Sequence, residues 1–194
     1  MNIGIYVYRN AEVLDFTGPY EVFSTASRLC EPGDEFSVSL VSELPGPLDA
    51  RGGLQILPHC SFADHPRFDV LIIVGGVHEA EMTKSAVLAW IAGQSICAQI
   101  TASVCTGVFL LAAAGVISDH RVTTHWQDLD DLKQQFPALD VCAGPRWIDC
   151  GPVLSSAGIS AGIDMSLYLV SRLRSRELAV KTAKQMDFDW RLDS

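Results

Sequence analysis

The sequence predicts an α/β protein with a doubly wound, mainly parallel sheet and helices on both faces. Short runs rich in β-branched residues alternate with longer segments of helical periodicity, which is the pattern of strands joined by crossover helices. Apart from Asp69, the run at 68–76 is apolar up to its two closing glycines, as expected for a strand covered on both faces. Because no repeat, low-complexity tract or linker divides the 194 residues, a single domain over 1–194 is expected.

The predicted elements follow one another along the chain. Strands are predicted at 3–8, 36–42, 68–76, 99–104 and 121–125. Helices are predicted at 18–29, 81–95, 106–116, 126–136 and, as one long helix or two consecutive ones, 161–186. Segment 52–62 is extended and irregular, and Pro58 limits it. Segment 141–158 resembles a β-meander with turns at 143–145 and 150–152.

Charge and composition exclude several functional classes. The chain has 23 acidic and 14 basic residues and a net charge of −9, so we expect no nucleic-acid partner. The basic stretch at 171–184 is interpreted as the solvated face of a helix. No apolar segment approaches the about 20 residues that cross a bilayer. The first residues also lack the basic region of a signal peptide, so we expect a cytoplasmic protein without a membrane partner.

The six cysteines do not form a recognisable metal-binding or redox motif. They contain no CxxC pair and no Cys/His spacing of a zinc site. We therefore expect reduced thiols, no metal and no other cofactor.

Cys105 lies where a predicted strand turns directly into a predicted helix. Such a junction projects the side chain away from the sheet, as in a nucleophile elbow, and the helix N-terminus favours a thiolate by lowering the thiol pKa. The backbone N–H of Thr106 would point near the sulfur, and Gly107 would allow close approach of the backbone. The alternative is an inert core thiol, since most buried cysteines behave as small apolar residues.

Three segments fall at the ends of predicted strands. They are 14–19, 75–76 and 105–106. Ligands of doubly wound sheets bind outside the carboxyl ends of the strands, so we expect these segments to converge. Gly76 would then offer a second N–H donor to a bound oxyanion, although a tight turn explains the two glycines equally well.

Two titratable residues could transfer a proton beside the thiol. Asp15 stands between Leu14 and Phe16, so it is either a partly desolvated carboxyl with a raised pKa or a helix cap. His125 follows a predicted strand and could act as the base of a Cys–His pair, but a lone histidine at such a position is more often structural.

Five motifs follow one another along the chain. They are DxTGPxEVF from Asp15, GG at 75–76, SVCTGxxxLAxAG from Ser103, TTHW from Thr123 and GISAGID from Gly158. This ordered set resembles the ThiJ/PfpI superfamily, and within it the isonitrile hydratase-like members. The resemblance covers nearly the whole chain. It implies a flavodoxin-like fold related to class I glutamine amidotransferases, and a homodimer acting on a small molecule.

The resemblance also implies roles for individual residues. Cys105 would be the nucleophile, Asp15 the acidic residue beside it, and the amides of Gly76 and Thr106 would bracket the bound carbon or oxyanion. Thr106 would also hydrogen-bond near the site through its hydroxyl. The protease branch has histidine where this chain has Thr106, which argues against peptide cleavage.

Three functional hypotheses follow from these residues. The first is hydration of an isonitrile to an N-formamide, with the Cys105 thiolate as nucleophile and Asp15 transferring a proton. The second is a glyoxalase-like or amidase-like reaction of the same thiolate on a carbonyl. The third is a redox or small-ligand sensor without enzymatic activity, in which Cys105 is oxidised.

Overall fold

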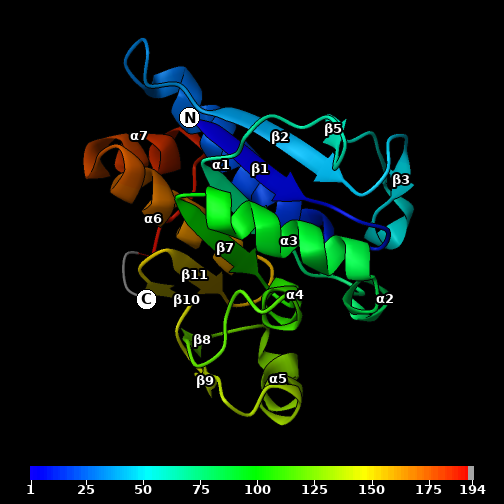
Figure 1. Ribbon diagram of the computed structural model, residues 1–194. Coiled ribbons are helices and arrows are strands. Elements are labelled where there is room, and N and C mark those ends of the chain that lie inside the picture. Colours follow the sequence, from blue (N-terminus) through cyan, green and yellow to red (C-terminus); the bar gives the residue numbers. More distant parts are fainter. Residues whose placement is uncertain (192–194) are drawn as a thin grey trace.

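A seven-stranded sheet forms the centre of the computed structural model, which describes residues 1–191 (Figure 1). The strands lie in the order β10-β11-β7-β6-β1-β2-β5. In that order their bounds are Trp147–Cys150, Val153–Ser156, Ile100–Val104, Val70–Ile73, Asn2–Tyr6, Ser37–Ser42 and Cys60–Ser61. All neighbours are parallel except β10 and β11, which confirms the predicted mainly parallel sheet. Residues 192–194 of the expected domain lie outside the described residues.

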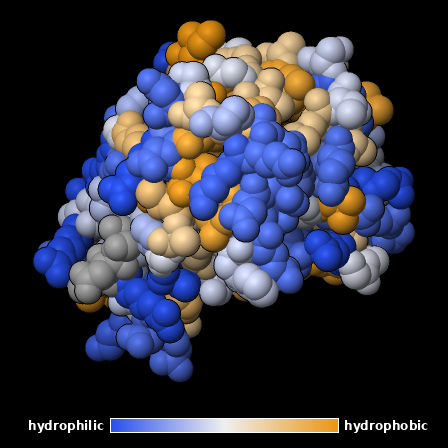
Figure 2. All heavy atoms as spheres, turned by 90° about the horizontal axis from the view of Figure 1, so that it is seen from below, coloured by the Kyte–Doolittle hydropathy of each residue, from blue (hydrophilic) through white to orange (hydrophobic). Residues whose placement is uncertain are grey.

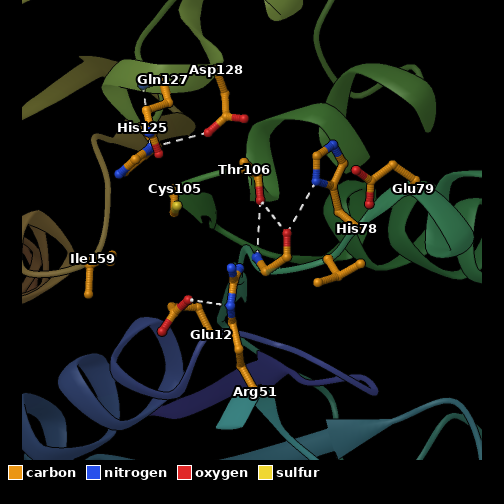
Figure 3. Close-up of a pocket in the computed structure, with 12 residues that line it drawn as sticks. Glu12, Arg51, His78, Glu79, Cys105, Thr106, His125, Gln127, Asp128 and Ile159 are labelled. Carbon is orange, nitrogen blue, oxygen red and sulfur yellow. Dashed lines mark hydrogen bonds and ion pairs between the residues drawn. The ribbon is translucent and has the colours of Figure 1, made fainter.

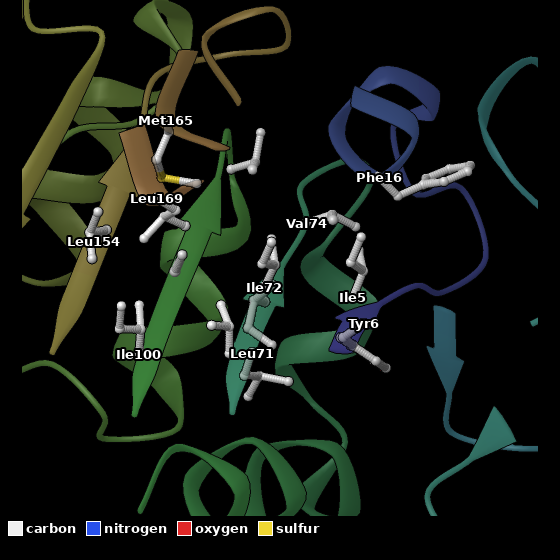
Figure 4. Packing of buried hydrophobic residues seen from close by; sticks show 14 of the residues in the cluster. Ile5, Tyr6, Phe16, Leu71, Ile72, Val74, Ile100, Leu154, Met165 and Leu169 are labelled. Atoms are coloured by element: carbon white, nitrogen blue, oxygen red, sulfur yellow. The ribbon is translucent and has the colours of Figure 1, made fainter. Parts of the chain in front are cut away.

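Helices cover both faces of the sheet. One face carries α1 (Val13–Leu29), α6 (Ala161–Leu173) and α7 (Arg176–Gln185), which contact one another. The other face carries α3 (Ser85–Cys97) and α4 (Gly107–Ala113). Figure 4 shows Met165 and Leu169 of α6 lying over strands β7 and β11. Both side chains belong to the buried core. Burial of these apolar faces is the main stabilising contribution to the fold.

Short elements complete the chain. A hairpin pairs β3 (Leu48–Asp49) with β4 (Gln55–Ile56), and η1 (Arg51–Gly53) lies between them. A parallel pair joins β8 (Arg121–Val122) to β9 (Asp140–Val141). The remaining helices are α2 (Glu79–Met82), η2 (Trp126–Asp128) and α5 (Leu129–Gln135).

The first helix begins earlier than predicted. The sequence predicted a start at 18, with Pro19 near the first turn, but α1 begins at Val13 and contains Pro19. Proline removes one backbone donor, here the N–H that would bond to the Asp15 carbonyl, and the helix continues past it. Asp15 therefore lies in the first turn of α1 and not before the helix.

The strand predicted at 121–125 is also shorter in the structure. Only Arg121–Val122 forms a strand, and it pairs with β9 outside the main sheet. Beyond Val122, bonds that involve side chains replace the backbone hydrogen bonds of a strand. The Thr123 N–H donates to Ser155 Oγ (3.0 Å), and the Thr124 hydroxyl donates to the Cys105 carbonyl (2.9 Å). The predicted meander is accordingly reduced to the β10–β11 hairpin.

The surface carries mixed polarity. Figure 2 shows hydrophilic residues spread over the face seen from below, with apolar areas between them. Within residues 1–191, no helix combines the length and the apolar character needed to cross a membrane.

Candidate active site

The register of the sheet brings the ends of three strands together. Ile73 of β6 pairs with Ser103 of β7, and Val104 of β7 pairs with Ser156 of β11. The chain leaves these strands through Val74–Gly76, Cys105 and 157–160 respectively, so the three connections lie at one edge of the sheet. The predicted segments 75–76 and 105–106 therefore converge. The third predicted segment, 14–19, lies in α1 and not at a strand end, but its Asp15 reaches the same place through a bond from the Gly75 N–H.

Cys105 occupies a strained elbow between β7 and α4. Its φ is 56°, a left-handed value that is uncommon for residues other than glycine and is concentrated at functional sites. Gly107 permits the tight turn, because a Cβ at this position would lie 2.1 Å from the carbonyl oxygen of Ile73. The side chain of Cys105 is only 7% exposed and faces a cavity (Figure 3). This is the geometry predicted for a nucleophile elbow.

Asp15 lies beside the thiol and is fully buried. Its Oδ2 accepts the Gly75 N–H at 3.0 Å, and no N–H or O–H among the described residues reaches its Oδ1. Burial raises the pKa of Asp15 to about 7, against the opposing effects of the Gly75 N–H and of the Cys105 thiol. The interpretation of Asp15 as a desolvated proton carrier therefore agrees with the structure better than a helix cap, since Glu12 occupies the N-cap of α1 and the Asp15 side chain accepts the N–H of Gly75 outside the helix.

The thiol pKa moves in the opposite direction from the prediction. Burial and the charge of Asp15 raise the pKa of Cys105, and the nearby N–H groups of Thr106 and Ile159 lower it less. The helix N-terminus was expected to give a free thiolate, but burial beside a carboxylate outweighs it. The site is best described as an acid pair in which Asp15 and Cys105 share one proton.

Thr106 and Gly76 bond to each other. The Thr106 hydroxyl accepts the Gly76 N–H at 3.0 Å and lies 3.2 Å from the Gly76 carbonyl oxygen, to which it donates (Figure 3). The Gly76 N–H, predicted as an oxyanion donor, is thus already engaged. Ile159 supplies the second N–H near the sulfur in its place, together with the predicted N–H of Thr106.

His125 lines the same cavity but does not bond to Cys105. It caps η2, with Nδ1 accepting the Gln127 N–H at 3.4 Å and lying 3.2 Å from Asp128 Oδ2. Within residues 1–191 no hydrogen bond joins His125 to the thiol. Of the two alternatives for His125, the structural one agrees with these contacts, and Asp15 is the titratable group that acts directly on the thiol.

The cavity has a volume of about 360 Å³ and a mixed polar lining. Its walls come from six segments of the chain, and the lining residues are Glu12, Arg51, Gly76, Val77, His78, Glu79, Cys105, Thr106, His125, Gln127, Asp128 and Ile159. Arg51 and Glu12 form an ion pair of 3.5 Å across one wall (Figure 3). In the part of the chain that the structure describes, no cluster of three side chains could hold a metal ion.

The sequence did not predict that Ile159, Arg51 and Asp128 line the cavity. Ile159 stands in the quoted GISAGID motif and directly follows β11, so its position at a strand end was an available signal. Arg51 lies in the turn between β3 and β4, and no pattern in the sequence ties that turn to Cys105.

The fold and site define a class: an α/β protein with a buried cysteine at a strand–helix elbow and a carboxylate beside it. The DJ-1/PfpI family model matches residues 1–172, and the chain belongs to this family. Isonitrile hydratase from Pseudomonas putida is 32% identical over 97% of this chain and 78% of its own length. A ThiJ/PfpI family protein from Pseudomonas syringae has a similar structure, with a TM-score of 0.86 and 28% identity over 97% of this chain and 75% of that one.

A regulator is also among the relatives. The HTH-type transcriptional regulator CdhR from Pseudomonas aeruginosa is 27% identical over 89% of this chain. The chain spans 51% of the length of that regulator.

Proposed function

We propose that the protein is a cysteine-dependent enzyme that hydrates an isonitrile, R–NC, to the N-formamide R–NH–CHO. The observation that carries the proposal is the buried Asp15 carboxyl, with a pKa of about 7, beside the thiol of Cys105. Hydration of an isonitrile requires a proton on the same carbon that the sulfur attacks, and this pair supplies both groups. The similarity to the Pseudomonas putida isonitrile hydratase over 97% of the chain supports the same substrate class.

The first step forms a thioimidate. The thiol proton moves to Asp15, so that the sulfur is an anion and the carboxyl is neutral. The sulfur then bonds to the terminal carbon of the isonitrile, and Asp15 gives its proton to that carbon. The product is R–N=CH–S–Cys105 with Asp15 as the carboxylate. The N–H groups of Thr106 and Ile159 stabilise the sulfur while it is charged.

The second step releases the formamide. Water adds to the thioimidate carbon, one of its protons goes to the nitrogen and the other goes to the Asp15 carboxylate. The C–S bond then breaks as the carbonyl forms, which leaves the thiolate and the neutral carboxyl. Return of the proton from Asp15 to the sulfur restores the starting thiol and carboxylate. A carboxyl with a pKa near 7 can give and take this proton at neutral pH.

The test is formamide production from p-nitrophenyl isocyanide. We expect turnover by the reduced wild type, none by Cys105→Ala, and a loss of about 100- to 10,000-fold for Asp15→Asn, which keeps the shape but cannot transfer the proton. Cys97→Ala, at an exposed thiol, is the matched control and should remain fully active. No turnover by the wild type, or undiminished turnover by Cys105→Ala, contradicts the proposal. Consumption of methylglyoxal alone would assign the glyoxalase-like reaction instead.

A second candidate function is the binding of a small ligand as a sensor. The similarity to about half of the regulator CdhR favours it. Oxidation by peroxide also proceeds through the thiolate, so the redox form of this hypothesis needs the same transfer of the thiol proton to Asp15. Ligand-induced stabilisation without turnover of any candidate substrate would support sensing.

A further inference from the structure

The connection from β11 to α6 presents a backbone N–H to the candidate nucleophile. Ile159 has a φ of 52°, which a β-branched residue adopts only when its surroundings hold it there. Ile159 lines the same cavity as Cys105, and its N–H acts on the thiol by lowering its pKa. The position of this N–H therefore depends on whatever fixes residues 157–160.

One arginine is bonded to both ends of this connection. The Arg146 carbonyl accepts the Ala157 N–H at 2.8 Å, and its guanidinium donates to Ser160 Oγ at 3.4 Å. The same guanidinium bonds Asp164 in the first turn of α6, with Nε 2.7 Å from Oδ2. Arg146 thus contacts the chain before Ile159, directly after it and one turn further on.

The second contact of the connection is with His125. A Cβ at Gly158 would lie 2.0 Å from the His125 ring, so the ring packs directly on the backbone of Gly158. This contact limits movement of Gly158 toward His125. The bond from the Arg146 guanidinium holds Ser160, at the other end of the connection.

Asp164 makes the anchor rigid. Its side chain is fully buried, and its other oxygen, Oδ1, accepts the Arg191 N–H at 3.0 Å. A buried carboxylate is costly without a partner, so Arg146 is held in one geometry by the need to pair it. The planar guanidinium can bond Asp164 and Ser160 at once, which a lysine ammonium at the same place would do poorly.

We propose that Arg146, held by Asp164, is a positioning residue that keeps the Ile159 N–H on the sulfur of Cys105. It acts through the connection at 157–160 and does not touch the reacting atoms. The inference concerns the thiol itself and does not depend on which substrate the protein takes.

The test is the pH dependence of the Cys105 thiol in variants of the full chain. Two measurements report the ionisation of this thiol. One is thiolate absorbance at 240 nm, with Cys105→Ala as background. The other is alkylation of Cys105 by iodoacetamide, followed by peptide mass spectrometry. We expect Arg146→Met to shift the curve of alkylation rate against pH to higher pH by about one unit, because the thiolate loses the N–H that stabilises it. At a fixed pH, alkylation should then be about tenfold slower. Arg146→Lys should lie between this variant and the wild type.

The control is Arg172→Met. Arg172 also pairs α6 with a carboxylate, Asp149 at 3.0 Å, but has no bond to residues 157–160. The groups that face Cys105 and could themselves titrate are unchanged in all these variants: Tyr8, Asp15, His125 and Asp128.

Two outcomes would overturn the proposal. One is an unmoved curve in a folded Arg146→Met, and the other is an equal displacement in Arg172→Met, which would indicate a general effect on α6. If Arg146→Met does not fold, Arg146→Lys and the isosteric Asp164→Asn decide by the same criterion. A failed assay for isonitrile hydration leaves this readout unaffected.

Discussion

Asp15 and Cys105 are both acids, and burial raises the pKa of each. Charging either one makes it harder to charge the other, so the pair holds two protons below about pH 7 and one proton above it. The two N–H groups on the sulfur then matter because they favour the form in which Asp15 holds that proton. At this scale the candidate site is a proton carrier and a nucleophile in contact, and its reactivity depends on where one proton resides.

Stability should depend on pH through Asp15. Its folded pKa of about 7 exceeds the ordinary value of 3.8, so between these values the folded chain keeps a proton that the unfolded chain releases. The free energy of unfolding should therefore fall as the pH rises from about 4 to about 7, by at most about 4 kcal/mol, and level off above it. Urea denaturation at pH 5 and pH 8 measures this change.

Asp15→Asn should remove most of that dependence and be more stable than the wild type at pH 8. Asp130→Asn, at a fully solvated position on α5, serves as control and should retain the slope of the wild type. Equal slopes for the wild type and Asp15→Asn would show that Asp15 does not titrate near 7.

Some of these residues could be found from the sequence and others could not. Cys105 and Asp15 could be found because strand ends and an apolar setting are visible in the order of residues. The direction of the Cys105 pKa could not, since it depends on how deeply the thiol is buried and on its contact with Asp15. The engagement of the Gly76 N–H by Thr106 depends on a side-chain rotamer, which no sequence pattern encodes.

Among the elements, α4 depends on its close approach to β6. A Cβ at Gly107 would lie 2.1 Å from the Ile73 carbonyl oxygen, which belongs to rigid backbone. Gly107→Ala should therefore push α4 away and destabilise the fold by about 1–3 kcal/mol. The expected result is a lower urea midpoint, with slower alkylation of Cys105 because the elbow moves.

Gly93→Ala is the matched control. Gly93 lies inside α3, and nothing approaches within 4 Å of its added Cβ. Alanine there should leave stability unchanged or raise it by about 0.5–1 kcal/mol through helix propensity. Equal effects of the two substitutions would exclude the close approach as the reason for Gly107.

The elements themselves were mostly predictable where apolar runs are long. The strands β2, β6 and β7 lie within their predicted segments, and β1 begins one residue before its own. The signal is clearest for β6, where burial on both faces leaves a continuous apolar run. The two-residue strands β8 and β9 carry no such signal, and their pairing is decided by contacts distant in sequence. The start of α1 was missed because Pro19 suggested a first turn that tertiary packing overrides.

On the scale of the whole molecule, negative charge surrounds the route to the thiol. The net charge is −9, and the cavity has the carboxylates of Glu12, Glu79 and Asp128 against one arginine, Arg51. The charge of Asp128 also contributes to the raised pKa of Cys105. A field of one sign in a cleft concentrates ligands of opposite charge and repels those of the same charge.

Thiol reagents of opposite charge should therefore react with Cys105 at different rates. A methanethiosulfonate bearing a trimethylammonium group should modify Cys105 at least about tenfold faster than one bearing a sulfonate, at low ionic strength. Raising the salt to 1 M, where the screening length is about 3 Å, should reduce most of this ratio. Peptide mass spectrometry separates Cys105 from the other thiols, and the same reagents on the urea-unfolded chain give the intrinsic ratio. The ratio of the two rates in the folded chain could instead equal the intrinsic ratio and stay unchanged when salt is added. Charges lining the cavity would then not act at the sulfur, and recognition of a substrate would rest on shape and hydrogen bonds alone.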